Sequence, residues 1–294
     1  MIKSNYSIKK ISLIYLLSLL PLIGYGFYKN GIILYIKKYV DIFGLLKPLI
    51  ILSIGFIIGI IVNIIYEYIF KKNKNNIIDV IFSSFHPIYG VLIAAISSIN
   101  TSIVLFSITT FIVLFVSKFL SLKINYISLT GLIMFFIMTL FHEFTFLNIY
   151  ESSNNFNMNA IDYLFGKGSG GLFTTNIILL IVSFIILYNL KTYKRLIPII
   201  ATTVFSTFVI IYSIYNNNIG NIFEMLFTNG ILFSFIYIAP ETISSCYTKK
   251  GIVIYSILVG IITFLLYLIN PVLSSLGSIL IVSIFNSLID LKFE

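Results

Sequence analysis

Long apolar runs separated by short clusters of lysine constrain this chain more than any other feature. The 294-residue sequence is 59% hydrophobic and only 10% charged, with a mean hydropathy of +1.06. Soluble domains are usually about 45–50% apolar. Runs of about 20 apolar residues match the thickness of the hydrocarbon core of a bilayer. The sequence therefore predicts a polytopic membrane protein and excludes a soluble globular domain.

The apolar runs predict about ten transmembrane helices. We expect them at residues 11–27, 48–70, 77–98, 103–122, 128–146, 172–190, 196–215, 222–246, 252–269 and 272–291. His86-Pro87 interrupts the third run and Pro240-Glu241 the eighth. Proline removes a backbone donor and clashes with the preceding turn, so both helices are predicted to be broken.

A broken element in third place of each half indicates an internal duplication. Because five helices is an odd number, the two halves would be inverted across the membrane, as in transporter-like folds with discontinuous helices. We predict an all-α fold of two inverted five-helix repeats, with broken third and eighth helices. The first repeat is expected at residues 1–147 and the second at 172–294, joined by an outer loop at 148–171.

Basic residues predict the orientation, because lysine and arginine concentrate in the cytoplasmic loops of membrane proteins. With the N-terminus inside, 14 of the 19 basic residues fall on the cytoplasmic side. The other five, placed outside, are Lys29, Lys37, Lys38, Lys47 and Lys167. We expect a multi-pass protein of a bacterial inner membrane with both termini cytoplasmic. Basic residues with this role in orientation do not indicate nucleic-acid binding.

Two features of the first half predict local structure. Residues 29–47 are predicted to form an outer loop, with at most a short interfacial helix. Gly55 and Gly59 lie four residues apart in the second predicted span. Small residues at this spacing let helix backbones approach closely, so we expect a tight helix contact there.

An acid beside a helix-breaking proline inside an apolar run is the strongest functional signal. Carbonyls freed by Pro240, near Phe235 and Ile236, need partners from neighbouring helices, hydroxyl groups or water. Carboxylates at membrane depth usually face the bundle interior and mark a path for ions, protons or ligands. We therefore interpret Glu241 as part of an ion or proton path, with Ser244 as a neighbouring hydroxyl.

The same path is predicted to include Ser245, Asn286 and His86. Histidine titrates near neutral pH, which suits a proton relay, although a structural or interfacial histidine explains His86 as well. Asn286 lies one turn before Asp290, which we interpret as an inner-face charge beside the C-terminus.

The break in the eighth predicted span also has a purely structural explanation. In it, Pro240 and Glu241 lie at the inner end of the helix, near Lys249 and Lys250.

A glycine-rich stretch, residues 166–171, precedes the sixth predicted span. It does not end in the Gly-Lys-Ser/Thr of a nucleotide-binding loop. Its backbone amides can still meet a phosphate group at a helix N-terminus, where the helix dipole favours anions. A flexible entry loop with Thr174 or Thr175 near the helix cap explains the stretch equally well.

Catalytic and metal sites are not predicted. Cys246 is the only cysteine, and His142-Glu143 lacks the second histidine of a zinc-protease motif. No nucleophile and base are paired in sequence. The sequence therefore gives little support to a hydrolase.

The C-terminal third resembles one family of membrane subunits. The matching segments are residues 239–245, Lys250-Gly251, residues 255–260 and residues 286–290. The family comprises the D subunit of the Rnf ion-translocating electron-transport complex and the B subunit of the sodium-pumping NADH:quinone oxidoreductase. Glu241 falls where the family has aspartate in Ala-Thr-Asp-Pro-Val-Thr-Ser. Weaker similarity extends over the whole chain, including the glycine-rich stretch.

The resemblance implies a fold of two inverted five-helix repeats and a function. The implied function is that of an integral membrane subunit in a flavin-dependent electron-transport complex, with other membrane subunits, the lipid bilayer, and Na+ or H+ as partners. The alternative is a small-solute or ion transporter that uses the same two-repeat cavity, with Glu241 and His86 lining the path.

Covalent flavin is not expected. Family members that carry covalent FMN have Ser-Gly-Ala-Thr in the outer loop, where this chain has Ser152-Ser153-Asn154-Asn155. FMN or riboflavin would then be held without a covalent bond. The residues that the resemblance and the glycine pattern assign to such a cofactor are Gly166, Gly168, Ser169, Gly170, Gly171, Thr174 and Thr175.

Overall fold

The computed structural model describes residues 8–70, 80–81, 84–120, 158–241 and 245–292 of the chain. Four helices in these ranges are long and apolar enough to cross a membrane, at residues 8–36, 42–69, 196–215 and 249–267. Five shorter apolar helices accompany them. The prediction of an all-α membrane protein is thus confirmed. The arrangement of ten helices in two repeats stays a prediction, because the expected fifth span at 128–146 lies outside the described residues.

The described residues of the first half form two long helical segments and two shorter helices. Their bounds are α1 Ile8–Phe27, η1 Tyr28–Ile32, α2 Ile33–Ile36, α3 Ile42–Ile65, η2 Tyr66–Phe70, α5 His86–Ile96 and α6 Ile103–Leu120. Helix α1 continues through η1 and α2 without interruption, and α3 begins at Ile42 with Asp41 as its N-cap. The predicted outer loop at 29–47 is therefore wrong over most of its length, and only a short turn joins the helices.

The second half begins with a short helix just before the glycine-rich stretch. Its elements are α8 Ala160–Leu164, α9 Ile177–Tyr188, α10 Leu196–Tyr215, η3 Ile219–Asn221, α11 Ile222–Phe227, α12 Ile231–Phe233, η4 Ser234–Ile238, α13 Lys249–Tyr267, α14 Ser274–Ile284 and α15 Asn286–Leu291. Helix α10 has the predicted bounds. The last predicted span is divided at Phe285 into α14 and α15.

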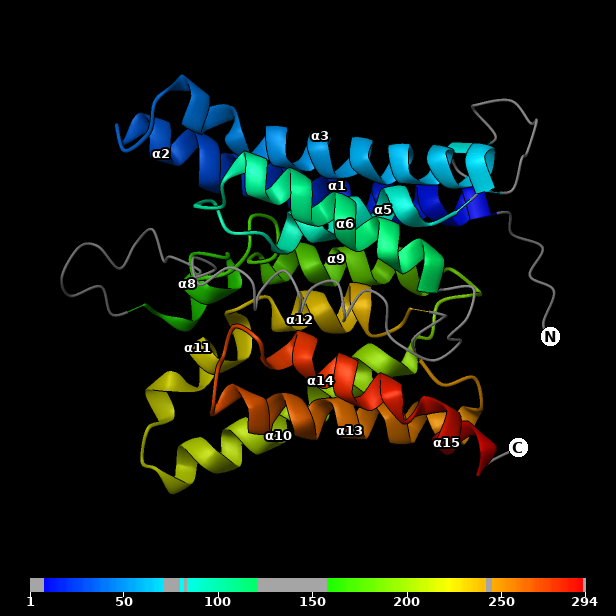
Figure 1. Ribbon diagram of the computed structural model, residues 1–294. Coiled ribbons are helices and arrows are strands. Elements are labelled where there is room, and N and C mark those ends of the chain that lie inside the picture. Colours follow the sequence, from blue (N-terminus) through cyan, green and yellow to red (C-terminus); the bar gives the residue numbers. More distant parts are fainter. Residues whose placement is uncertain (1–7, 71–79, 82–83, 121–157, 242–244, 293–294) are drawn as a thin grey trace.

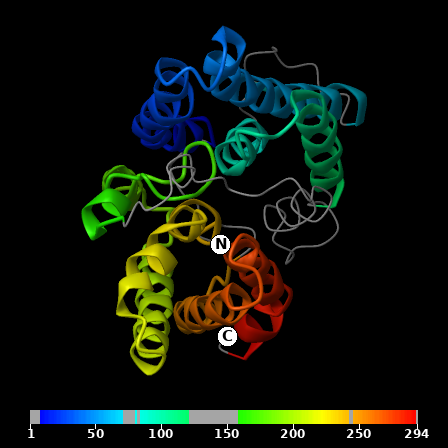
Figure 2. The ribbon, with the colours of Figure 1, turned by 90° about the vertical axis from the view of Figure 1, so that its left-hand side faces the viewer.

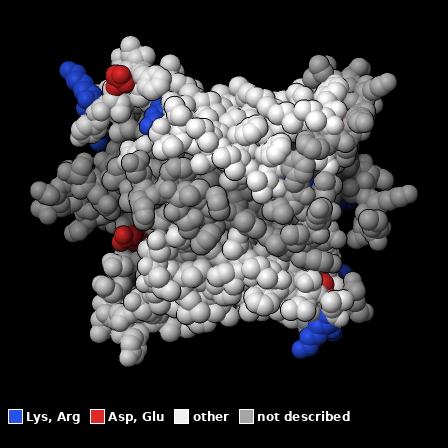
Figure 3. Space-filling model, viewed as in Figure 1, with Lys and Arg blue, Asp and Glu red and all other residues white. Residues whose placement is uncertain are grey.

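The long helices run roughly side by side, and the two halves of the chain form separate groups (Figure 1). Seen end on, the blue to cyan helices lie together above the yellow to red ones, with green α9 between them (Figure 2). Helix α1 begins and α15 ends on the same side of the molecule (Figure 1). On the face shown in Figure 3, the charged side chains of the described residues lie mainly near the two ends of the helices, and the described surface between them is largely uncharged. Such a band suits the hydrocarbon core of a bilayer.

Close backbone contact joins α3 to α5, as the glycine spacing predicted. A Cβ atom added at Gly55 would lie 2.4 Å from the carbonyl oxygen of Gly90, and one at Gly59 would lie 2.5 Å from that of His86. Neither position has room for a side chain. Small residues therefore fix α5 against α3, and this contact sets the position of the short third helix.

Candidate functional site

The eighth predicted span is broken twice, once as predicted and once where no break was expected. Helix α11 ends at Phe227, and the chain turns through Asn229 and Gly230, whose φ angles are +58° and +68°. Helix α12 and η4 follow and end at Ile238, just before Pro240. The sequence signal for the first break is the Asn-Gly dipeptide, which favours left-handed turn conformations.

Tyrosine hydroxyls satisfy the carbonyls freed at the second break. The hydroxyl of Tyr193 donates to the carbonyl oxygen of Ile236 at 2.8 Å, and that of Tyr255 donates to Ala239 at 3.3 Å. Tyr193 lies in the turn before α10, and Tyr255 on α13. The expectation that neighbouring elements would supply these partners is confirmed. The broken end is thus fixed from two sides.

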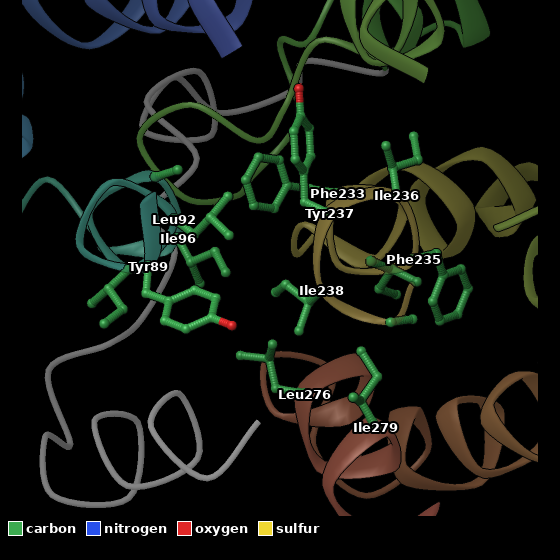
Figure 4. Close-up of a cluster of buried hydrophobic side chains, with 14 of the residues drawn as sticks. Tyr89, Leu92, Ile96, Phe233, Phe235, Ile236, Tyr237, Ile238, Leu276 and Ile279 are labelled. Atoms are coloured by element: carbon green, nitrogen blue, oxygen red, sulfur yellow. The ribbon is translucent and has the colours of Figure 1, made fainter. Parts of the chain in front are cut away.

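Glu241 follows this break, and its side chain is only 8% exposed. Its Oε1 atom accepts a hydrogen bond from the hydroxyl of Tyr89 on α5. Figure 4 shows Tyr89 reaching from α5 toward Ile238 of η4 and Leu276 of α14. A buried carboxylate needs donors to offset its lost hydration. The two broken elements of the chain therefore meet at an acid and a phenol.

An aromatic cluster surrounds this contact. The ring of Tyr15 on α1 lies 4.9 Å from that of Phe85 and 6.2 Å from that of Tyr237. The Tyr89 ring lies 5.5 Å from that of Phe85. These side chains come from α1, η4 and the start of α5, so the Tyr89–Glu241 contact lies inside the bundle among rings from three elements.

Ser245 links the glutamate to a lysine. Its hydroxyl donates to the backbone carbonyl of Glu241 at 2.5 Å. The ammonium of Lys194 donates to Oγ of Ser245 at 2.6 Å and to its carbonyl oxygen at 2.9 Å. Lys194 lies in the turn before α10, 4.6 Å from the ring centre of Tyr247. Burial lowers the pKa of Lys194 from 10.5 to about 8. Ser244, also predicted here, lies outside the described residues.

The other two predicted path residues lie apart from the carboxylate. The ring of His86 lies between the hydroxyls of Ser84, at 3.1 Å, and Ser117, at 3.4 Å. Its centre is 5.5 Å from that of the Tyr89 ring, one helical turn further along α5. Asn286 accepts from the thiol of Cys246 at 3.4 Å. The structure thus joins Glu241 to Ser245 and places His86 beside Tyr89, whereas Asn286 contacts the segment after Ser245.

Asp290 does more than carry an inner-face charge. Its carboxylate, in a side chain that is 6% exposed, accepts from the backbone amides of Tyr247 and Thr248 at 2.9 and 3.1 Å. The interpretation of Asp290 as a simple surface charge is therefore wrong. It fixes the turn that leads into α13.

The glycine-rich stretch encloses a buried lysine. Lys29, only 4% exposed, donates from Nζ to the carbonyls of Gly166 and Gly168, both at 2.7 Å, and to Oγ1 of Thr175 at 3.3 Å. The neighbouring Asn30 donates to the carbonyl of Leu172 at 2.7 Å. Placing Lys29 in an outer loop was wrong: carbonyl oxygens of the stretch satisfy its ammonium inside the protein.

The amides of the same stretch have a different environment. Among the described residues, no acceptor faces the backbone N–H groups of Gly168, Ser169, Gly170 and Gly171. Gly166 has a φ of +80°, and a Cβ atom on Gly171 would lie 2.6 Å from the carbonyl of Ile96. Successive free amides next to an ammonium suit an anion. The anion site that the glycine pattern predicts at residues 166–171 stays a prediction.

The helix after the stretch begins later than predicted. The amide of Leu172 donates to the carbonyl of Ser97, just beyond the end of α5, at 2.9 Å. The amide of Phe173 donates to the carbonyl of Ala95, in the last turn of α5, at 3.1 Å. These bonds engage the two amides outside any helix, and α9 begins at Ile177 with Asn176 as its N-cap. The predicted start at Leu172 is wrong, whereas Thr174 and Thr175 lie near the cap, as expected. Thr175 also accepts a hydrogen bond from Lys29.

The comparison with known families decides the membership. The model of the NQR2, RnfD, RnfE family matches residues 1–294. The chain belongs to this family. No curated protein matches it. The resemblance of its C-terminal third to the Rnf and sodium-pumping oxidoreductase subunits is confirmed, and the family is consistent with a membrane subunit of an electron-transport complex.

Three residues of the candidate site were not predicted from the sequence. Tyr89 was one aromatic residue among many on an apolar helix, and Lys29 and Lys194 were counted only as loop charges. Each is recognised by a partner distant in the sequence. Only Lys29 had a signal in the sequence, and it was weak. The apolar run before Lys29 resumes after it, at residues 31–36.

Proposed function

We propose that this chain is an integral membrane subunit of an ion-translocating electron-transport complex and that Tyr89 and Glu241 form its ion-exchange site. The observation that carries the proposal is the buried carboxylate of Glu241, held by the Tyr89 hydroxyl where two broken elements meet. Acids inside the membrane are costly, and they usually serve ion or proton paths. Discontinuous helices supply the polar backbone groups that such sites use.

The contact is suited to coupling because it joins two separately supported segments. Helix α5 is fixed to α3 by glycine contacts, whereas the break before Glu241 is fixed by Tyr193 and Tyr255 from the second half. A displacement between the halves would change the distance from Tyr89 to Glu241. The affinity of the carboxylate for a cation would then depend on the conformation, which is what coupled transport requires.

The glycine-rich stretch fits the phosphate group of a flavin held without a covalent bond. Lys29 supplies a positive charge, and the amides of residues 168–171 supply donors, since the described residues offer them no other acceptor. A bound flavin would supply one- and two-electron transfer. The protein's part is to hold the phosphate and to fix the stretch between α5 and α9.

Purification of the tagged chain from its own membranes tests this function. We expect redox subunits and a flavin absorbance to copurify, and the flavin to be released by denaturation. Vesicles that contain the complex should couple oxidation of an electron donor to uptake of an ion. A chain that purifies alone, lacks flavin and moves a solute without any electron donor would support the transporter alternative instead.

A further inference from the structure

Lys194 occupies the position that a metal ion would need beside Ser245. Its ammonium lies 2.9 Å from the carbonyl oxygen of Ser245 and 2.6 Å from its hydroxyl oxygen. Backbone carbonyls and hydroxyls at a broken helix are the ligands that transporters offer to Na+. Here both oxygen atoms of one residue already bind a cation that belongs to the chain.

The hydroxyl of Ser245 is engaged on both sides. It donates its one proton to the carbonyl oxygen of Glu241 and accepts from Lys194. A hydroxyl has one proton and two lone pairs, so one lone pair of Ser245 stays open, but the adjacent ammonium repels a metal ion there. The Glu241 carbonyl, another oxygen of the broken segment, already accepts this bond.

The titratable groups that act on Glu241 come from several elements. They are the phenols of Tyr89 on α5, Tyr15 on α1 and Tyr255 on α13, and the amine of Lys194 in the turn before α10. Lys194 is also influenced by Cys246 and Asp290. The hydroxyl of Tyr89 donates a hydrogen bond to the Glu241 carboxylate, and the ammonium of Lys194 lies at Ser245 of the same segment. Such surroundings suit an acid that gains and loses a proton.

We propose, on the basis of the function proposed above, that Glu241 exchanges a proton and not Na+, with the ammonium of Lys194 as a cation of the chain itself at Ser245. In the exchange, a carboxylate oxygen of Glu241 forms an O–H bond when the site opens to one side. The same bond breaks when the site opens to the other side. No electron moves in this step, and Tyr89 keeps its own proton.

Labelling of the full-length purified chain with a hydrophobic carbodiimide tests the proposal. The reagent adds to protonated carboxyl groups, and mass spectrometry measures the labelled fraction of Glu241. We expect labelling to decrease as pH rises and to be the same in about 100 mM Na+ as in an equal concentration of a large organic cation. A Na+ site with a Kd of about 1 mM would slow labelling about 100-fold at that concentration. Such protection, or no labelling at any pH, would overturn the proposal.

Two matched variants isolate the lysine. Lys194→Met removes the cation and exposes both oxygen atoms of Ser245, so protection by Na+ should appear only in this variant. Lys191→Met changes an exposed lysine of the same turn and should behave like the parent protein. If Lys194→Met shows no protection by Na+, the ammonium does not exclude the ion, and the proposal is wrong.

Failure of this proposal is distinguishable from failure of the function. Protection of Glu241 by Na+ in the parent protein would make Na+ the coupling ion and leave the ion-exchange site in place. If the proposed function itself is wrong, a Glu241 variant will keep full activity in the assembled complex.

Discussion

The hydroxyl of Tyr89 donates a hydrogen bond to the carboxylate of Glu241, across 152 positions of sequence. Tyr89 belongs to the short third helix of the chain, and Glu241 follows the broken segment near the end of the predicted eighth span. The two interruptions of the apolar pattern therefore meet in space. This contact connects the fold to the proposed function, because a movement of either element alters the surroundings of the acid.

The glycine contact that positions Tyr89 should not tolerate a methyl group. In Gly90→Ala, the new Cβ would lie 1.9 Å from the carbonyl oxygen of Gly55, so α5 must move away from α3. Overpacking of this kind costs about 1–3 kcal/mol. We expect a lower melting temperature in detergent. Gly24→Ala is the control, because a Cβ atom there meets nothing within 4 Å. Equal melting temperatures for the two variants would contradict the contact.

The hydrogen bond from the Tyr193 hydroxyl to the broken helix should stabilise the protein. Tyr193→Phe leaves the carbonyl of Ile236 without its donor, and a buried unsatisfied group costs about 1–3 kcal/mol. Thermal unfolding measures the loss. Tyr215→Phe, at a side chain that is 84% exposed, should have no effect. If the two substitutions are equivalent, the hydroxyl of Tyr193 has no structural role.

Lys29 should hold the glycine-rich stretch against α5. Lys29→Met removes the donor to Gly166 and Gly168. We expect the amides of Leu172 and Phe173 to exchange hydrogen faster by about ten-fold or more, since each lost partner costs about 1–3 kcal/mol. Hydrogen exchange followed by mass spectrometry measures this. Lys37→Met, at the exposed end of the same helical segment, provides the comparison, and unchanged protection in Lys29→Met would exclude the role.

Lys194 should make stability depend on alkaline pH. Burial lowers its pKa to about 8 in the folded protein, whereas the unfolded chain has the ordinary value of 10.5. Between these values the unfolded state holds more protons on Lys194, so its contribution to the free energy of unfolding rises with pH. The melting temperature of the parent protein should therefore rise relative to that of Lys194→Met as the pH increases from about 8. A difference that stays constant or shrinks would contradict the shift.

Composition and local pattern sufficed for much of the fold. The apolar run at residues 196–215 became α10 with the predicted ends, and Gly55 and Gly59 marked a real helix contact. Pro240 predicted the second break of the eighth span. In each case the determining physics is local: chain length against bilayer thickness, a missing donor or a missing side chain.

What the sequence could not predict depends on distant partners. Lys29 has the pattern of a loop charge, and only carbonyl groups 137 and 139 residues away make its burial favourable. Leu172 belongs to an apolar run, yet its amide donates to the carbonyl of Ser97 and the residue lies outside α9. Tyr89 cannot be distinguished from core aromatic residues until Glu241 is placed beside it. Residues 152–155, which stand where flavin-carrying members have Ser-Gly-Ala-Thr, lie outside the described residues. The absence of covalent FMN therefore stays a prediction.

The most direct test of the central claim is ion uptake by vesicles that contain the assembled complex with Glu241→Gln. This substitution keeps the shape and one acceptor oxygen for Tyr89 but removes the charge. Insertion should not suffer, because an acid costs about 2.5–3.5 kcal/mol at the centre of a membrane helix. We predict normal amounts of assembled complex, electron transfer that no longer drives ion uptake, and partial uptake in Glu241→Asp. Full uptake by Glu241→Gln would contradict the account.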